Sequence, residues 1–183
     1  MDIRGGIRSC LASARGDSWV VVSTILERMR ELVRTVRYVM TIHALDAMED
    51  DELTVFDVER CFLTGRIVER QRDRARREWK YLVEGWLTDG SRAAVIAKVT
   101  RTHRHMVCDI CGKRGARIRR VTRSFGKGKA TFLIEAVPVV SCPKCGEGYL
   151  TADTLREVER IRQKRRRLTK GRLVPVATFG SLA

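Results

Sequence analysis

The stretch "SCPKCGEGYL", residues 141–150, places two cysteines two residues apart in a turn of proline, lysine and glycine. The same spacing occurs upstream in "CDICGKRG", so that Cys108, Cys111, Cys142 and Cys145 form two pairs separated by 30 residues. A CxxC turn lets both sulfur atoms point at one ion, and two such turns supply the four thiolates of a tetrahedral zinc site. We therefore expect one structural zinc ion, with no open coordination position for catalysis.

Other roles of the cysteines fit the sequence less well. A thioredoxin-like redox motif has a single CxxC at the start of a helix, and a disulfide framework needs an oxidising compartment. The chain shows no usable export signal, so we expect a cytoplasmic location. His103 and His105 lie close enough to be considered as ligands, but four cysteines already satisfy the ion, which favours exposed linker histidines. Cys61 lies in an apolar helical pattern and Cys10 has no spaced partner.

The basic charge is concentrated in the half of the chain that carries the cysteine pairs. Residues 1–105 have 19 Lys and Arg against 16 Asp and Glu, and residues 106–183 have 18 against 6, which gives the net charge of +15. Such a field attracts polyanions, so RNA, DNA or an acidic protein surface are the expected partners. The longest apolar stretch, "WVVVSTIL", is far shorter than the ~20 residues that span a bilayer, so no membrane contact is expected.

The residue patterns predict an α+β fold. In the first half, residues 24–35 have the spacing of an amphipathic helix, and residues 36–42 alternate as a half-buried strand leading into a helix that begins near His43. A second helix follows, with Thr54 and Asp57 as a capping box and Gly65 as its end. Residues 66–69 are a short strand and 70–78 a charged loop. Residues 79–99 are a hairpin with a type I′ turn at Asp89-Gly90, in which Trp79 and Trp86 are expected in the core.

The second half reads as a hairpin between the cysteine pairs and a helix after them. Residues 116–142 alternate around a turn at Gly126 and Gly128, which would bring the two pairs together. The helix starts at Thr151 or Asp153 and stops near Gly171. The run Arg165, Arg166 and Arg167 closes it, either as cations favourably placed at a helix end or as phosphate contacts of low specificity.

These patterns suggest four segments. Residues 1–28 are expected to be a disordered extension, or to precede a true start at Met29. Residues 29–105 form the first domain, residues 106–170 the zinc domain with its basic helix, and residues 171–183 a tail.

The second half resembles a known family. "CDICG", a hairpin and "FLIEAVPVVSCPKCGEGYLTADTLREVERI" are similar to the YgiT-type zinc finger, the N-terminal domain of MqsA-type antitoxins, over about residues 108–162. The resemblance implies binding to a toxin domain. Full antitoxins of this type continue into a helix-turn-helix, for which the residues after Arg167 leave no room.

The first half resembles the uncharacterised RelE-superfamily domains, which are relatives of MqsR-type toxins. The matching residues are "TIHA" at 41–44, "DV" at 57–58, Gly65 and "KYLVEG" at 80–85. The resemblance implies a small RelE/MqsR-like sandwich of two helices and an antiparallel sheet that cleaves mRNA. It also implies His43 as the acid/base and Lys80 and Tyr81 as phosphate contacts, while charge alone suggests Arg66 and Arg70.

Two departures from the family pattern bear on activity. The helix after His43 carries Asp46, Ala47 and Asp51 where the family tends to carry arginines, and an acidic helix repels RNA. The family's last strand is replaced by "RTHRHMV", which runs directly into the first cysteine pair. Without the family pattern, His43 would be interpreted as a histidine that caps its own helix.

Two functions follow from these resemblances. The first is a toxin-antitoxin fusion in which the zinc domain masks an mRNA-interferase-like domain that acts on RNA or the ribosome, with contact within one chain or between two copies. The second is a catalytically degenerate zinc-finger module that binds nucleic acid or a partner protein. A purely structural zinc protein is the remaining alternative.

Overall fold

The computed structural model describes residues 17–73, 78–99 and 107–174. We call the described residues up to 99 the N-terminal half and those from 107 the metal half. The helices are α1 (Asp17–Arg34), α2 (Ile42–Asp50), α3 (Val55–Thr64), the 3-10 helix η1 (Gly128–Ala130), α4 (Ala152–Gln163) and α5 (Arg165–Leu168). The strands are β1 (Val39–Thr41), β2 (Arg66–Asp73), β3 (Glu78–Trp86), β4 (Arg92–Ala97), β5 (Arg117–Phe125), β6 (Phe132–Ser141) and β7 (Gly148–Thr151).

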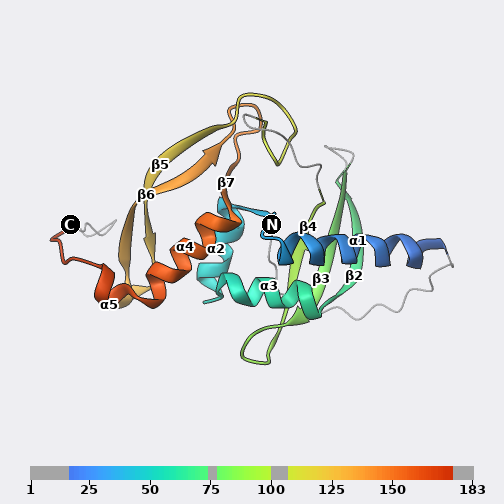
Figure 1. Cartoon of the computed structure of the whole chain (residues 1–183), viewed down its shortest axis with the longest axis horizontal. Coiled ribbons are helices and arrows are strands. Elements are labelled where there is room, and N and C mark those ends of the chain that lie inside the picture. The colour runs from blue at the N-terminus through green and yellow to red at the C-terminus, as the bar shows by residue number, and fades with distance from the viewer. Residues whose placement is uncertain (1–16, 74–77, 100–106, 175–183) are drawn as a thin grey trace, which may run out of the picture.

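The strands form two antiparallel sheets, one in the order β1-β7-β6-β5 and one in the order β2-β3-β4. Figure 1 shows the long β5–β6 hairpin curving along one side of the molecule and the three-stranded sheet on the other, with α2 and α4 between them. The expected α+β class is thus present. Among the described residues no helix combines the length and the apolar character needed to cross a membrane.

Strand β1 departs from the expected arrangement. It is only three residues long, because Val36 has a left-handed φ of 57° before it and Thr41 already caps α2 by accepting a hydrogen bond from the Ala44 amide. It pairs with β7, with Val39 opposite Thr151 and Thr41 opposite Tyr149. The strand that leads to His43 therefore belongs to the sheet of the metal half and not to the sheet that contains "KYLVEG".

One hydrophobic core spans both halves. Buried residues of the N-terminal half, such as Met40 and Val58, belong to the same cluster as Ile134, Leu150 and Leu155 of the metal half. Helix α3 covers the three-stranded sheet on the side where Tyr81, Val83 and Val95 are buried. The two segments on either side of residues 100–106 therefore share their core.

Four other expectations are corrected. Helix α1 begins at Asp17, inside the stretch that was expected to be disordered, while residues 1–16 and both linker histidines, His103 and His105, lie outside the described residues. The expected charged loop is part of β2 as far as Asp73, because Arg70–Asp73 pair with β3. The helical segment ends at Leu168 rather than near Gly171, and a break at Lys164 puts Arg165, Arg166 and Arg167 in the separate short helix α5.

The turn between β3 and β4 also differs from the expected type I′ turn. The Leu87 amide donates to the Ser91 carbonyl and the Gly90 amide to the Leu87 carbonyl, which leaves three residues in the loop. Gly90 has a φ of 86°, whereas Asp89 is not left-handed and instead accepts from the Ser91 amide. The loop is therefore longer than a two-residue type I′ turn, which would need positive φ at both positions.

The capping box at the start of α3 is confirmed and extends beyond the helix. The side chain of Thr54 accepts from the Asp57 amide, and Asp57 accepts from the Thr54 amide at 2.9 Å. The other carboxylate oxygen of Asp57 accepts from the amide and hydroxyl of Thr88, which ties the helix to the β3–β4 turn. Burial alone raises the pKa of Asp57, but these hydrogen bonds from Thr54 and Thr88 lower it to about 2.

We predict that Asp57→Asn lowers the free energy of unfolding at pH 7 by about 2 kcal/mol, from the shift of the pKa from 3.8 to about 2. Because the folded pKa is depressed, this contribution is fully present above about pH 4 and is lost as the pH falls toward 2. Urea unfolding at several pH values measures it. Asp153→Asn, at an exposed first-turn position of α4, should cost less than about 1 kcal/mol. Equal losses for the two variants would contradict the prediction.

Candidate metal centre and the contacts between the two halves

The two cysteine pairs form turns of the same geometry. In the first, the Gly112 amide donates to the Cys108 carbonyl and the Cys108 amide to the Lys113 carbonyl. In the second, the Gly146 amide donates to the Cys142 carbonyl and the Cys142 amide to the Glu147 carbonyl. Gly112 and Gly146 have φ values of 69° and 75°, which a glycine adopts without strain. The glycine that directly follows each pair therefore closes each turn.

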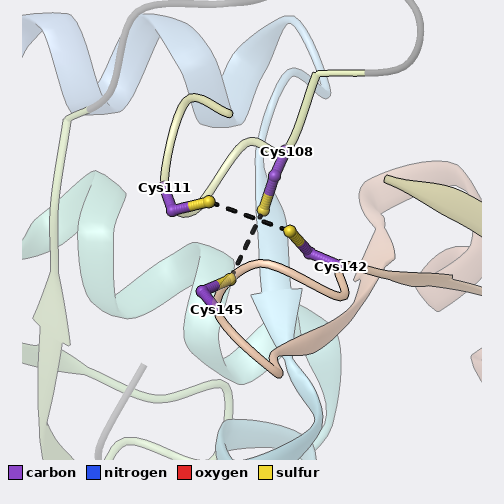
Figure 2. Close-up of side chains that lie close together, drawn as sticks. All are labelled: Cys108, Cys111, Cys142 and Cys145. Carbon is purple, nitrogen blue, oxygen red and sulfur yellow. Dashed lines mark hydrogen bonds between the residues drawn. The ribbon is translucent and has the colours of Figure 1, made fainter. Parts of the chain in front are cut away.

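The hairpin brings the turns together, as the sequence predicts. Arg117 pairs with Ser141 at the base of the β5–β6 ladder, so Cys142 comes next to the first turn. Figure 2 shows the four sulfur atoms converging from the two loops. All four lie within 4.8 Å of one another, and the Sγ atoms of Cys108 and Cys145, and of Cys111 and Cys142, are 3.8 Å apart.

The spacing of the sulfur atoms fits a metal ion. Sulfur atoms about 2.3 Å from a tetrahedral centre lie about 3.8 Å from each other. A disulfide needs about 2.05 Å, and the four cysteines are free thiols. The four cysteines can therefore hold one metal ion through four thiolates.

The environment of the thiols differs within the cluster. Cys108 and Cys142 are buried, whereas Cys111 and Cys145 are half-buried. Burial raises the pKa of Cys108 to about 12. Burial also acts to raise the pKa of Cys142, but hydrogen bonds from the backbone amides of Cys145 and Lys144 lower it to about 7. Because thiolates are the ligands, metal uptake must displace the protons that remain.

Tyr149 connects the cysteine cluster to the N-terminal half. Its side chain is buried in a small second cluster with Cys108, Cys142 and Ala116. Its hydroxyl accepts from the Asp109 amide in the first turn at 3.1 Å, and its position in β7 is opposite Thr41. One residue thus contacts the first cysteine turn and lies beside the N-cap of the helix that carries His43.

Ion pairs join the acidic helix α2 to the metal half. Arg123 of β5 pairs with Asp46 at 2.5 Å, and Arg162 of α4 pairs with Glu49 at 2.5 Å. The second oxygen of Glu49 accepts from the Gly126 amide at 3.1 Å, and the Lys127 ammonium donates to the Asp50 carbonyl at 2.6 Å. Two of the acidic side chains after His43, Asp46 and Glu49, thus bind arginines of the metal half.

A more buried pair joins α3 to α4. The Nε and Nη2 atoms of Arg156 donate to the buried carboxylate of Glu59, with the closest contact at 2.9 Å. The hydroxyl of Tyr38 donates to the same carboxylate at 2.6 Å, and burial raises the pKa of Tyr38. No sequence pattern pointed to these three residues, because 97 residues separate Glu59 from Arg156.

The structure distributes the remaining predicted site residues over several elements. His43 is exposed in the first turn of α2. Lys80 is half-buried on β3, in the other sheet, and Tyr81 beside it is buried in the core. Arg165, Arg166 and Arg167 are exposed on α5. The four cysteines thus form one cluster, as predicted. Tyr81 is buried, so it does not face solvent as a residue that binds phosphate would.

Comparison with known protein families gives a match to part of the chain. Residues 40–120 are similar to DUF4258, a domain of unknown function, over 81 of the 183 residues. The matched region runs from β1 through the three-stranded sheet and includes Cys108 and Cys111. No curated protein and no solved structure matches this chain.

Proposed function

We propose that this chain is a single-chain toxin-antitoxin protein, in which the metal half holds a RelE/MqsR-like ribonuclease domain closed. The observation that carries the proposal is the docking of α2, because Asp46 and Glu49 bind arginines of the metal half. The buried Glu59–Arg156 pair and the β1–β7 pairing add to this contact. The resemblances to YgiT-type zinc fingers and to RelE-superfamily domains supply the toxin and antitoxin roles.

Zinc is the metal that we propose for the cysteine cluster. Four thiolates in a tetrahedral arrangement suit Zn²⁺ or iron, and a closed four-cysteine site is the usual structural zinc site. A reducing compartment such as the cytoplasm keeps such thiols available to the ion. The ion would fix the two turns and, through Tyr149, the strand that pairs with β1.

Covalent linkage makes weak contacts sufficient for masking. Two segments of one chain meet at an effective concentration of about millimolar, so an interface need not be tight to stay closed. Exposed ion pairs contribute only about 0.2–1 kcal/mol each, but several of them act here together with a shared core. We therefore propose a closed state within one chain.

His43 is the proposed acid/base once the chain opens. Its side chain is already exposed in the closed chain, and Thr41, two residues before it, lies on the strand that pairs with β7, so loosening of the metal half would free the backbone around it. Tyr81 is buried on the face of the sheet that α3 covers, so its burial comes from the N-terminal half and not from the metal half. Helix α2, which carries His43, becomes free of Arg123 and Arg162 only on opening.

We predict that the double variant Arg123→Glu/Arg162→Glu of the full chain arrests bacterial growth on induction. The new carboxylates would face Asp46 and Glu49 and repel α2. Adding His43→Ala should restore growth. The readouts are colony counts and cleavage of total RNA in the same cells.

The matched control is Arg119→Glu/Arg160→Glu, which makes the same charge change on the same two elements. Arg119 is exposed on β5, and Arg160 pairs with Glu157 within α4. This control should leave growth unchanged. If the double variant is soluble and metal-loaded yet neither arrests growth nor cleaves RNA, the chain is the catalytically degenerate binding module instead.

A further inference from the structure

Trp79 is exposed, which corrects the expectation that it lies in the core. It shares a face of β3 with Tyr81 and Val83, because side chains alternate along a strand. Tyr81 and Val83 are buried at 5% and 0% exposure, whereas Trp79 is 39% exposed. The covered part of this face therefore ends before Trp79, and the indole extends beyond it.

Two arginines of β2 gather around this indole. Arg72 is directly opposite Trp79 in the β2–β3 register. Arg70, two residues before Arg72 in β2, is opposite Tyr81 and lies on the same face. The guanidinium carbon of Arg70 lies 3.5 Å from the ring centroid, and that of Arg72 lies 5.8 Å from it. Among the residues that the structure describes, no carboxylate pairs with either arginine. Both cations are therefore available to an anion.

Trp86, at the other end of β3, provides a contrast. It is also exposed, and Arg92 lies 5.3 Å from its ring centroid. That arginine is neutralised by Glu84, at 2.7 Å. The alternation of side chains puts Trp86 on the opposite face of the sheet from Trp79. The arginine beside Trp86 is thus neutralised by a carboxylate, whereas within the described part of the chain the two arginines beside Trp79 are not.

We propose that Trp79, Arg70 and Arg72 form a binding site for single-stranded RNA. An exposed indole offers a surface on which a base of any kind stacks, and guanidinium groups bind the adjoining phosphates. The net charge of +15 draws such a polyanion to the chain. A substrate role for this site rests on the proposed function, but the binding itself does not, because Trp79 is exposed in the closed chain.

The test uses the full, metal-loaded chain and a fluorescein-labelled uridine 12-mer, with fluorescence anisotropy across a salt series. We expect Trp79→Ala to weaken binding by about tenfold, the effect of losing one stacked base. Trp86→Ala should leave the affinity unchanged. Arg70→Gln/Arg72→Gln should lower the slope of log affinity against log salt by about 1.4, since each phosphate contact contributes about 0.7 for single strands.

Two further ligands complete the test. An RNA duplex should show no difference between the wild-type chain and Trp79→Ala, because its bases are already stacked and paired. The second ligand is a thymidine 12-mer, which is single-stranded DNA. Equal affinities of Trp79→Ala and Trp86→Ala for the uridine 12-mer would overturn the proposal. Tighter binding of the wild-type chain to the thymidine 12-mer than to the uridine 12-mer would also overturn it. If RNA binding behaves as expected while Arg123→Glu/Arg162→Glu stays harmless, only the proposed function fails.

Discussion

Replacing Cys108 by serine, or removing the metal with a chelator, should unfold the two cysteine turns and lower the melting temperature by about 10 °C or more. Structural zinc contributes about 10–16 kcal/mol of apparent binding energy in zinc-finger peptides, and for a chain of this size 1 kcal/mol corresponds to about 2–4 °C. The turns have little else to hold them, because two of the four buried residues of their small core are themselves cysteines of the candidate metal site.

The loss should also reach the N-terminal half. Without the ion, Tyr149 loses a fixed partner in the first turn, and its strand β7 is paired with β1. We therefore expect faster amide hydrogen exchange in both turns, at β1 and at the first turn of α2. The centre of the three-stranded sheet, where Val83 and Val95 are buried, should keep its protection.

Cys61→Ala is the control for this prediction. Cys61 is fully buried, and its thiol contacts the carbonyls of Val83 and Ala93, away from the cysteine cluster. Mass spectrometry of metals should find one ion per chain in the wild type and in Cys61→Ala, and none in Cys108→Ser. Full metal content and an unchanged melting temperature in Cys108→Ser would contradict the assignment of the site.

Replacing Gly85 by alanine should destabilise the fold by about 3 kcal/mol or more, which corresponds to a fall in melting temperature of about 6–12 °C. A Cβ atom at this position would overlap the carbonyl oxygen of Cys61 and lie 2.8 Å from its carbonyl carbon. The neighbour is helix backbone, which cannot rotate away as a side chain can. Helix α3 would have to move off β3, and the buried residues between them would lose their packing.

Gly65 has the same restriction, since its Cβ would meet the same Cys61 carbonyl and lie 2.7 Å from the carbonyl oxygen of Glu84. Gly171 is the control, because nothing lies within 4 Å of a Cβ there and its φ is not left-handed. Gly171→Ala should change the unfolding free energy by less than about 0.5 kcal/mol. Thermal melts of the wild type, Gly85→Ala and Gly171→Ala measure the effect. Equal stability of Gly85→Ala and the wild type would refute the prediction.

Local sequence patterns were enough to predict several parts of the structure. The spacing of the cysteines predicted the metal cluster, because a CxxC turn fixes where its two sulfur atoms point. The Thr54–Asp57 box was predicted because it depends on residues three apart. Thr151 and Asp153 were the two predicted starts of the last helix, and the structure has Thr151 as its cap. The hairpin around Gly126 was predicted by alternation and by a turn that needs left-handed glycine.

Contacts between distant residues were decided by the tertiary structure. A three-residue strand carries too little pattern to reveal that β1 pairs with β7, 110 residues further along the chain. Alternation along β3 showed which side chains share a face, but not that the covered part of the face ends before Trp79. The partners of Asp46, Glu49 and Glu59 depend on how α2 and α3 pack against the metal half. The sequence by itself thus determined the four cysteines of the candidate metal site and the helix caps, which are set within a few residues. The contacts of α2 and α3 with the metal half and the exposed indole required the fold, because they arise only when separate elements are packed together.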